Sequence, residues 1–156
     1  MGFYSEYLER NLTHQKLVTE GKRQLRKISE LRGNRDVLAF ASDLFKTDAG
    51  PLISINHDDL LPISDQLSNL KGKAVDLILE TPGGSLEAAE DIVHLLRRKY
   101  SHLGIIVPGC AKSAGTLIAM AADEILMGPG SALGLIDAHL IWCGKTLSAG
   151  ELVDGM

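Results

Sequence analysis

The sequence predicts an α/β domain with a mostly parallel sheet, preceded by a helical arm. Strand-length and helix-length segments alternate three times between residues 75 and 127, a pattern typical of parallel sheets with right-handed crossovers. Residues 103–107 form an unbroken apolar run, as expected for a strand covered on both faces. With 156 residues, of which 45% are hydrophobic, the chain can bury a core of its own.

Composition excludes several classes of protein. The 23% of charged residues and the net charge of −4 are those of a globular protein and not of a disordered chain. The apolar run 117–122 is far too short to cross a bilayer, and the first residues lack the pattern of a signal peptide. Two cysteines without metal-ligand spacing favour a reducing cytoplasm and no metal site. Only 4% of the residues are aromatic, so we expect no binding to nucleic acid.

The first element is the helical arm, which we assign to residues 1–35. The pattern at 3–31 is helical, and we expect an interruption near Gly21 and an end at residues 33–34. Three apolar residues at helical spacing predict that the arm docks on another surface. They are Leu25, Ile28 and Leu31.

The arm is also basic. Residues 1–35 hold eight Lys and Arg against four Glu, a balance of +4, so the remaining residues carry −8. The basic residues of the cluster are Lys22, Arg23, Arg26, Lys27, Arg32 and Arg35. We favour a solvated helix face for these charges. Contact with an anionic partner or a membrane surface is the less favoured alternative.

The α/β domain, which we place at residues 36–156, begins with two short apolar runs of strand length at 37–41 and 52–55. A helix at 60–70 follows, with apolar residues three or four apart and the pair 58–59 available to cap it. The later strands are expected at 75–79, 103–107 and 124–127, and the later helices at 86–96 and 114–122. Residues 131–137 are expected to form a further strand or a loop.

A tight turn separates the strand at 75–79 from the next helix. Pro82 presets one backbone dihedral, Gly83 and Gly84 permit positive φ, and Ser85 can cap the helix. Such a turn exposes backbone N–H groups at the positive end of a helix, where an anion or a reacting oxyanion can bind. An ordinary strand-to-helix turn explains these residues equally well. The turn matches neither a dinucleotide-binding fingerprint nor a P-loop.

The second turn, at residues 109–116, places Ser113 at the start of an apolar helix. In this position Ser113 can act as a nucleophile, with the Ala114 N–H directed at the oxyanion that forms on attack. Taken alone, the residues favour a simpler alternative in which Ser113 only caps the helix. Cys110 is a weaker candidate nucleophile, because most cysteines beside an apolar run are inert core residues.

The two turns together predict a single site more strongly than either turn does alone. Each follows a strand of the predicted sheet, and the carboxyl ends of parallel strands lie at one edge, where sites form. The backbone donors of both turns can therefore converge on a single reacting atom, as an oxyanion hole requires.

Four stretches in this order resemble the ClpP/crotonase superfamily, and most closely its serine dehydrogenase proteinases, which are related to signal peptide peptidase A. They are DLILETPGG at 76–84, AKSAGTLIA at 111–119, AADEILMGP at 121–129 and LGLID at 133–137. The resemblance implies a ClpP-like fold of stacked ββα units, serine peptidase chemistry, a peptide or protein substrate and a homo-oligomer. It implies no metal or organic cofactor.

The resemblance also implies roles for individual residues. Ser113 matches the nucleophile, while Gly83, Gly84 and Ala114 match the positions of the oxyanion hole. The general base is left open, since the histidine of ClpP would fall near Ile136. The candidates for the base are Asp137, His139, Lys145 or a residue beyond Met156.

We therefore expect a serine peptidase, independent of ATP by itself, that hydrolyses peptide bonds through an acyl-enzyme on Ser113. Because no base is identified and the domain is shorter than the resemblance implies, a non-catalytic oligomeric scaffold or peptide-binding module is the alternative. A crotonase-type enzyme acting on an acyl-CoA thioester is less favoured, because no basic patch is placed to hold the nucleotide.

Overall fold

The computed structural model describes residues 12–45, 52–134, 139–142 and 145–148. Its centre is a four-stranded sheet in the order β1-β2-β3-β5, with every neighbouring pair parallel. The strands are β1 (Asp36–Ala41), β2 (Ala74–Glu80), β3 (His102–Val107) and β5 (Glu124–Met127). The predicted parallel α/β architecture is therefore confirmed, and the order of the strands in the sheet follows their order in the sequence.

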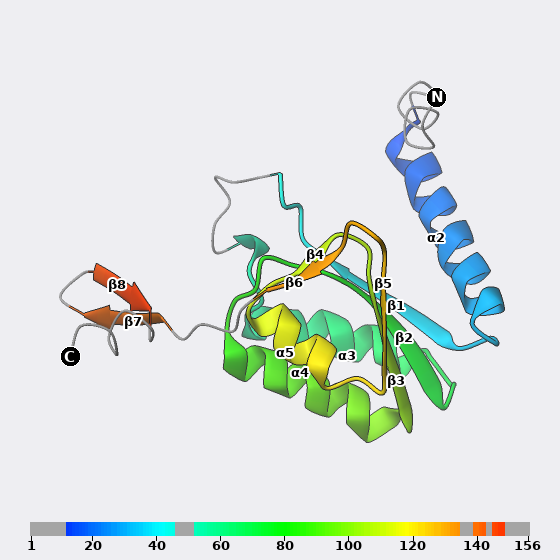
Figure 1. Cartoon of the computed structure of the whole chain (residues 1–156). Helices are drawn as coiled ribbons and strands as arrows, with labels where there is room; N and C mark the ends of the chain where they lie inside the picture. The colour runs from blue at the N-terminus through cyan, green and yellow to red at the C-terminus, as the bar shows by residue number, and fades with distance from the viewer. Residues whose placement is uncertain (1–11, 46–51, 135–138, 143–144, 149–156) are drawn as a thin grey trace.

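Three helices pack on one face of this sheet (Figure 1). They are α3 (Leu60–Ser68), α4 (Leu86–Lys99) and α5 (Ala114–Met120). The side chains of Leu103, Ile105 and Val107 on that face are fully buried, whereas Ile106 on the other face is only half-buried. The expectation that 103–107 is covered on both faces is thus wrong for the second face, because the helices of the described chain gather on the first.

The described chain also contains several shorter elements. β4 (Cys110–Ala111) pairs in parallel with β6 (Ala132–Leu133), and η2 (His57–Asp59) is a 3-10 turn before α3. β7 (His139–Trp142) and β8 (Lys145–Ser148) form an antiparallel hairpin.

The segment 52–55 is not the strand that its apolar run predicts. Leu52 and Ile53 have 3-10 geometry, and Ile55 alone forms a β-bridge, with Gly84. The Ser42 hydroxyl donates to the Ile53 carbonyl at 2.6 Å, which fixes the segment beside the end of β1 without a ladder. The predicted cap before α3 is also different, because Asn56 and Asp59 form a capping box around η2.

The arm is the helix α2 (His14–Leu31), which projects away from the sheet in Figure 1. It runs through Gly21 without the expected interruption, because one glycine weakens a helix by only about 1 kcal/mol. The predicted end is confirmed, with φ of 73° at Gly33 and 60° at Asn34. None of the residues of α2 is buried, and Leu31 is 77% exposed.

Two arginines after α2 tie the arm to the sheet, which corrects their assignment to a solvated face. The Arg32 Nε lies 2.8 Å from an oxygen of the fully buried Asp76, and the Arg32 guanidinium also bonds to Glu124. Arg35 lies 3.1 Å from Asp76 and 3.2 Å from Glu124. The hydrogen bonds to Asp76 and Glu124 raise the pKa of Arg32. A Cβ at Gly104 would meet the Asp76 carboxylate, so the glycine leaves room for this cluster.

Within the described part of the chain, none of the helices combines the length and the apolar character needed to cross a membrane.

Candidate active site

The two predicted turns lie side by side at the carboxyl edge of the sheet. The Thr81 N–H donates to the Cys110 carbonyl at 3.0 Å, and the Lys112 N–H donates to the Thr81 carbonyl at 3.1 Å. This pair of bonds makes a parallel bridge between Thr81 and Ala111. The two turns are therefore adjacent in the backbone, as their shared sheet edge predicts.

Gly83 is the point where the first turn touches Ser113. Its φ is 110°, and a Cβ built on it would lie 2.8 Å from the Ser113 Cβ and 2.9 Å from the Lys112 carbonyl oxygen. Any larger residue would therefore meet the second turn and would also be strained. Glycine at this position lets the first turn approach the Ser113 side chain closely.

Ser113 has the backbone of a strained elbow. Its φ of 48° and ψ of −116° place it, with Asn34, among the non-glycine residues of positive φ in the described chain. Such a conformation costs on the order of 1–3 kcal/mol and is found preferentially at functional sites. The side chain makes no capping hydrogen bond to α5, so the simpler alternative of Ser113 as an N-cap is not supported.

The backbone donors around Ser113 fall into two kinds. The N–H groups of Ala114 and Gly84 have no acceptor among the described residues, whereas the Gly83 N–H donates to the Thr81 hydroxyl at 3.1 Å. Ala114 is buried and begins α5, where the helix dipole adds positive potential. Among the described residues, the Ala114 and Gly84 N–H groups therefore differ from that of Gly83, which already has an acceptor.

Ile55 holds the first turn from its other side. Its N–H donates to the Gly83 carbonyl and its carbonyl accepts from the Ser85 N–H, both at 2.8 Å. A Cβ at Gly84 would meet the Ile55 backbone at 2.3–2.9 Å, so this position also requires glycine. Ser85 caps α4 as predicted, since its hydroxyl accepts from the Ala88 N–H at 3.2 Å. No sequence signal marks this role of Ile55, because its apolar run resembles a strand.

Thr116 connects the second turn to β6. Its hydroxyl oxygen accepts from the Gly134 N–H at 3.0 Å and lies 2.8 Å from the carbonyl oxygens of Ala111 and Gly134. The residue is 7% exposed. A hydroxyl in the middle of an otherwise apolar helix is the sequence signal that identifies it, because a buried polar group needs a partner.

The structure describes only some of the other residues considered as a nucleophile or general base. The Lys112 amine donates to the Leu133 carbonyl at 3.4 Å, and the stem of this side chain packs on Gly134. Cys110 is a partly buried free thiol in β4. His139 and Lys145 are described only as backbone positions of β7 and β8, and Asp137 lies outside the described residues. No group of His, Cys, Asp and Glu suited to a metal ion occurs in the portions of the chain that the structure describes.

A model of the family described as ClpP-like SDH-type serine proteinase matches residues 3–146. The chain belongs to this family. Two uncharacterized proteins of Methanocaldococcus jannaschii are similar to it, one 46% identical over 70 residues and the other 32% identical over 125 residues. These alignments cover 45% and 76% of the chain but only 24% and 41% of the two relatives. The chain therefore aligns with less than half of either relative's length.

Solved structures share the fold of this family member. The 1510-N membrane-bound stomatin-specific protease superposes with a TM-score of 0.58 at 20% identity, over 78% of the chain and 58% of that protein. A complex of the same protease with a substrate peptide gives 0.56 at 24% identity, over 78% of the chain and 55% of that protein. The ClpP catalytic domain of Plasmodium falciparum gives 0.53 at 12% identity, over 80% of the chain and 62% of that domain. The predicted ClpP-like fold is thus confirmed.

Proposed function

We propose that the protein is a serine peptidase that hydrolyses peptide bonds through an acyl-enzyme on Ser113. The observation that carries the proposal is the strained Ser113, whose side chain makes no capping bond and which lies beside Gly83 and the Ala114 N–H. Membership of a serine proteinase family supports the same chemistry. A polypeptide is the proposed substrate and the cytoplasm the proposed compartment.

The proposed reaction uses the two turns together. The Ser113 Oγ attacks the carbonyl carbon of the peptide, its proton passes to a general base, and the carbonyl oxygen becomes an oxyanion. The N–H groups of Ala114 and Gly84 stabilise this oxyanion, and Gly83 joins them if it releases the Thr81 hydroxyl. The base then gives the proton to the leaving amine, and water hydrolyses the acyl-enzyme. Asp137, His139 and Lys145 remain the candidates for the base within this chain.

The test is labelling with a fluorophosphonate, read by intact-protein mass spectrometry. We expect one adduct on the unmodified protein and none on Ser113→Ala, because the reagent reacts with an activated serine. Cys110→Ala and the surface variant Ser64→Ala are the matched controls and should both keep the adduct. Hydrolysis of an unfolded protein substrate should follow the same pattern.

The opposite results identify the alternatives. An adduct that persists in Ser113→Ala, or hydrolysis unchanged in that variant, would contradict the proposal. Tight peptide binding by the unmodified protein with neither adduct nor turnover would support the non-catalytic peptide-binding module instead.

A further inference from the structure

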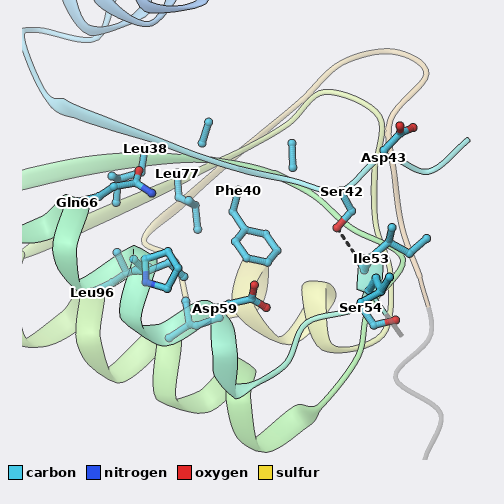
Figure 2. A pocket seen from close by; sticks show the side chains of 16 residues that line it. Leu38, Phe40, Ser42, Asp43, Ile53, Ser54, Asp59, Gln66, Leu77 and Leu96 are labelled. Atoms are coloured by element: carbon cyan, nitrogen blue, oxygen red, sulfur yellow. Dashed lines mark hydrogen bonds between the residues drawn. The ribbon is translucent and has the colours of Figure 1, made fainter. Parts of the chain in front are cut away.

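A cavity of about 330 Å³ lies between the end of β1, the segment 52–54 and the helices α3 and α4. Figure 2 shows Leu38, Phe40, Leu77 and Leu96 around its interior. This volume lies within the range of small-ligand sites and can hold a large aliphatic or aromatic side chain. The cavity is therefore an apolar site that the proposed chemistry at Ser113 does not use.

The polar groups of the cavity restrict what can occupy it. Asp59 is among the lining residues, and the lining contains no Lys or Arg. One Asp59 oxygen accepts the Asn56 N–H at 2.9 Å, which fixes the carboxylate in place. A fatty acid or a phosphate-bearing acyl group would bring a further negative charge to the Asp59 carboxylate. A neutral apolar group with a cation beside it complements this carboxylate.

The cavity is joined to the candidate active site through one short segment. Ile53 and Ser54 line the cavity, and the next residue, Ile55, forms two hydrogen bonds of 2.8 Å with the Gly83–Ser85 turn. Both sites lie at the carboxyl edge of the sheet, because β1 ends at the cavity and β2 ends at the turn. At the surface, Leu52 lines the cavity and is 88% exposed, which provides an apolar contact outside it.

We propose that this cavity is a docking site for a polypeptide substrate, away from the scissile bond. It binds one large apolar side chain, Leu or Phe, from a residue that has Lys or Arg as a neighbour. Calling the bound polypeptide a substrate rests on the proposed function. Binding of the polypeptide to the cavity does not require hydrolysis.

The experiment measures peptide binding to Ser113→Ala, which cannot cleave the probe under the proposed function. Fluorescent peptides of about 15 residues carry Phe-Lys, Ser-Lys or Phe-Glu at one position, and anisotropy gives each Kd. Burial of a large apolar side chain predicts that Phe to Ser weakens binding roughly 10- to 100-fold. The change of Lys to Glu should also weaken it, and by less at high salt.

A matched pair of variants locates the binding. Gln66 lines the cavity from α3 and is exposed, so Gln66→Trp should fill the mouth of the cavity. Its neighbour Asp65 is exposed but does not line the cavity, so Asp65→Trp is the control. In the Ser113→Ala background, we expect the first variant to lose the preference for Phe over Ser and the second to retain it. Circular dichroism on heating verifies that both variants fold.

Several results would overturn the inference. The first two are equal Kd values for the Phe and Ser peptides and equal behaviour of the two Trp variants. The third is displacement of the peptide by lauric acid at a lower concentration than the Phe-Lys peptide itself requires. The fourth is a change of oligomeric state on Gln66→Trp without a change in peptide Kd. The last result would assign the cavity to a second copy of the chain. If the peptides bind as expected but fluorophosphonate never labels Ser113, the docking site stands and the proposed peptidase function fails.

Discussion

Thr116 is the residue on which the arrangement around Ser113 depends most visibly. Its buried hydroxyl forms hydrogen bonds with Ala111, two positions before Ser113, and with Gly134, which follows β6. The chain after Gly134 leads to the candidate bases Asp137 and His139. Thr116 is therefore placed to fix the start of that segment relative to the second turn.

We predict that Thr116→Val lowers the free energy of unfolding by about 1–3 kcal/mol, because the isosteric side chain removes the hydroxyl contacts with the Ala111 and Gly134 carbonyls and leaves the Gly134 N–H only its longer bond of 3.3 Å to the Ala111 carbonyl. Thr116→Ser keeps the hydroxyl and should lose less. Urea unfolding followed by circular dichroism measures both. Fluorophosphonate labelling of Ser113 should also be slower in Thr116→Val than in Thr116→Ser. Equal stability and equal labelling of the two variants would contradict this role.

At the residue scale, the two turns and Ser113 were predictable from the sequence, but the contacts of Ile55 and Thr116 that hold the turns in place were not. The glycine pair and the serine were identifiable because each follows an apolar run and precedes a helix. The contacts of Ile55 and Thr116 depend on pairings between segments that are distant in sequence. The pairing of Arg32 with Asp76 spans 44 positions, so local charge patterning assigned Arg32 to a solvated face.

At the scale of elements, Asp123 joins α4, β3 and β5. Its carboxylate accepts from the Arg97 guanidinium at 2.7 Å and from the Leu103 N–H at 2.8 Å. The hydrogen bond from Arg97, followed by the one from Leu103, lowers the pKa of Asp123 to about 2. The next residue, Glu124, also has a lowered pKa, chiefly through its hydrogen bond to Arg32.

Both pKa shifts have the same consequence for stability. A carboxyl group whose pKa is lowered by folding stabilises the protein above its ordinary pKa, near 4, and that contribution is lost as the pH falls through the lowered value. We predict that the free energy of unfolding declines between about pH 4 and pH 2, measured by urea unfolding at each pH. Asp123→Asn should show a shallower decline in this window, and Asp65→Asn, at an exposed carboxyl of α3, is the control. A decline of equal slope in Asp123→Asn would exclude this origin.

The elements themselves were predictable to different degrees. The strands β2, β3 and β5 were found because their apolar runs are bounded by turns and their partners are adjacent in sequence. Residues 52–55 carry an equally apolar run, but they lie beside the end of β1, and in the described chain they form one isolated bridge, from Ile55 to Gly84. The sequence pattern shows which residues are apolar. Whether such a segment forms a strand depends on hydrogen bonding to a neighbouring strand.

At the scale of the whole molecule, α2 leaves an apolar side exposed. Leu17 is 50% exposed, Val18 is 43% exposed and Leu31 is 77% exposed, although α2 is strongly one-sided in its distribution of polar and apolar residues. Arg32 and Arg35 are paired within the chain, but residues 1–31 still hold six Lys and Arg against four Glu, a balance of +2 beside an acidic remainder. We therefore keep the division into a basic arm and an α/β domain as a prediction, and expect the arm of one copy to pack on another.

This expectation is tested by sedimentation velocity. Leu17→Asp places a charge on the apolar side of α2 and should shift the protein toward a smaller species, whereas Thr19→Asp, on the opposite side of the same helix, should not. Raising the salt concentration should weaken the association because opposite charges contribute to it. An identical sedimentation coefficient for both variants and the unmodified protein would refute a role for the arm in assembly.

The sheet order β1-β2-β3-β5 has a consequence for how the chain can be made. Each strand of this sheet pairs with the member of the same sheet that precedes it in the sequence, so every step closes only the crossover between them. A polypeptide leaving the ribosome has β1 and β2 available before β5 is synthesised, and each later unit adds to an edge that already exists. The protein can thus assemble its sheet in the order of translation, with the Ser113 elbow completed only after the glycine turn that it contacts is in place.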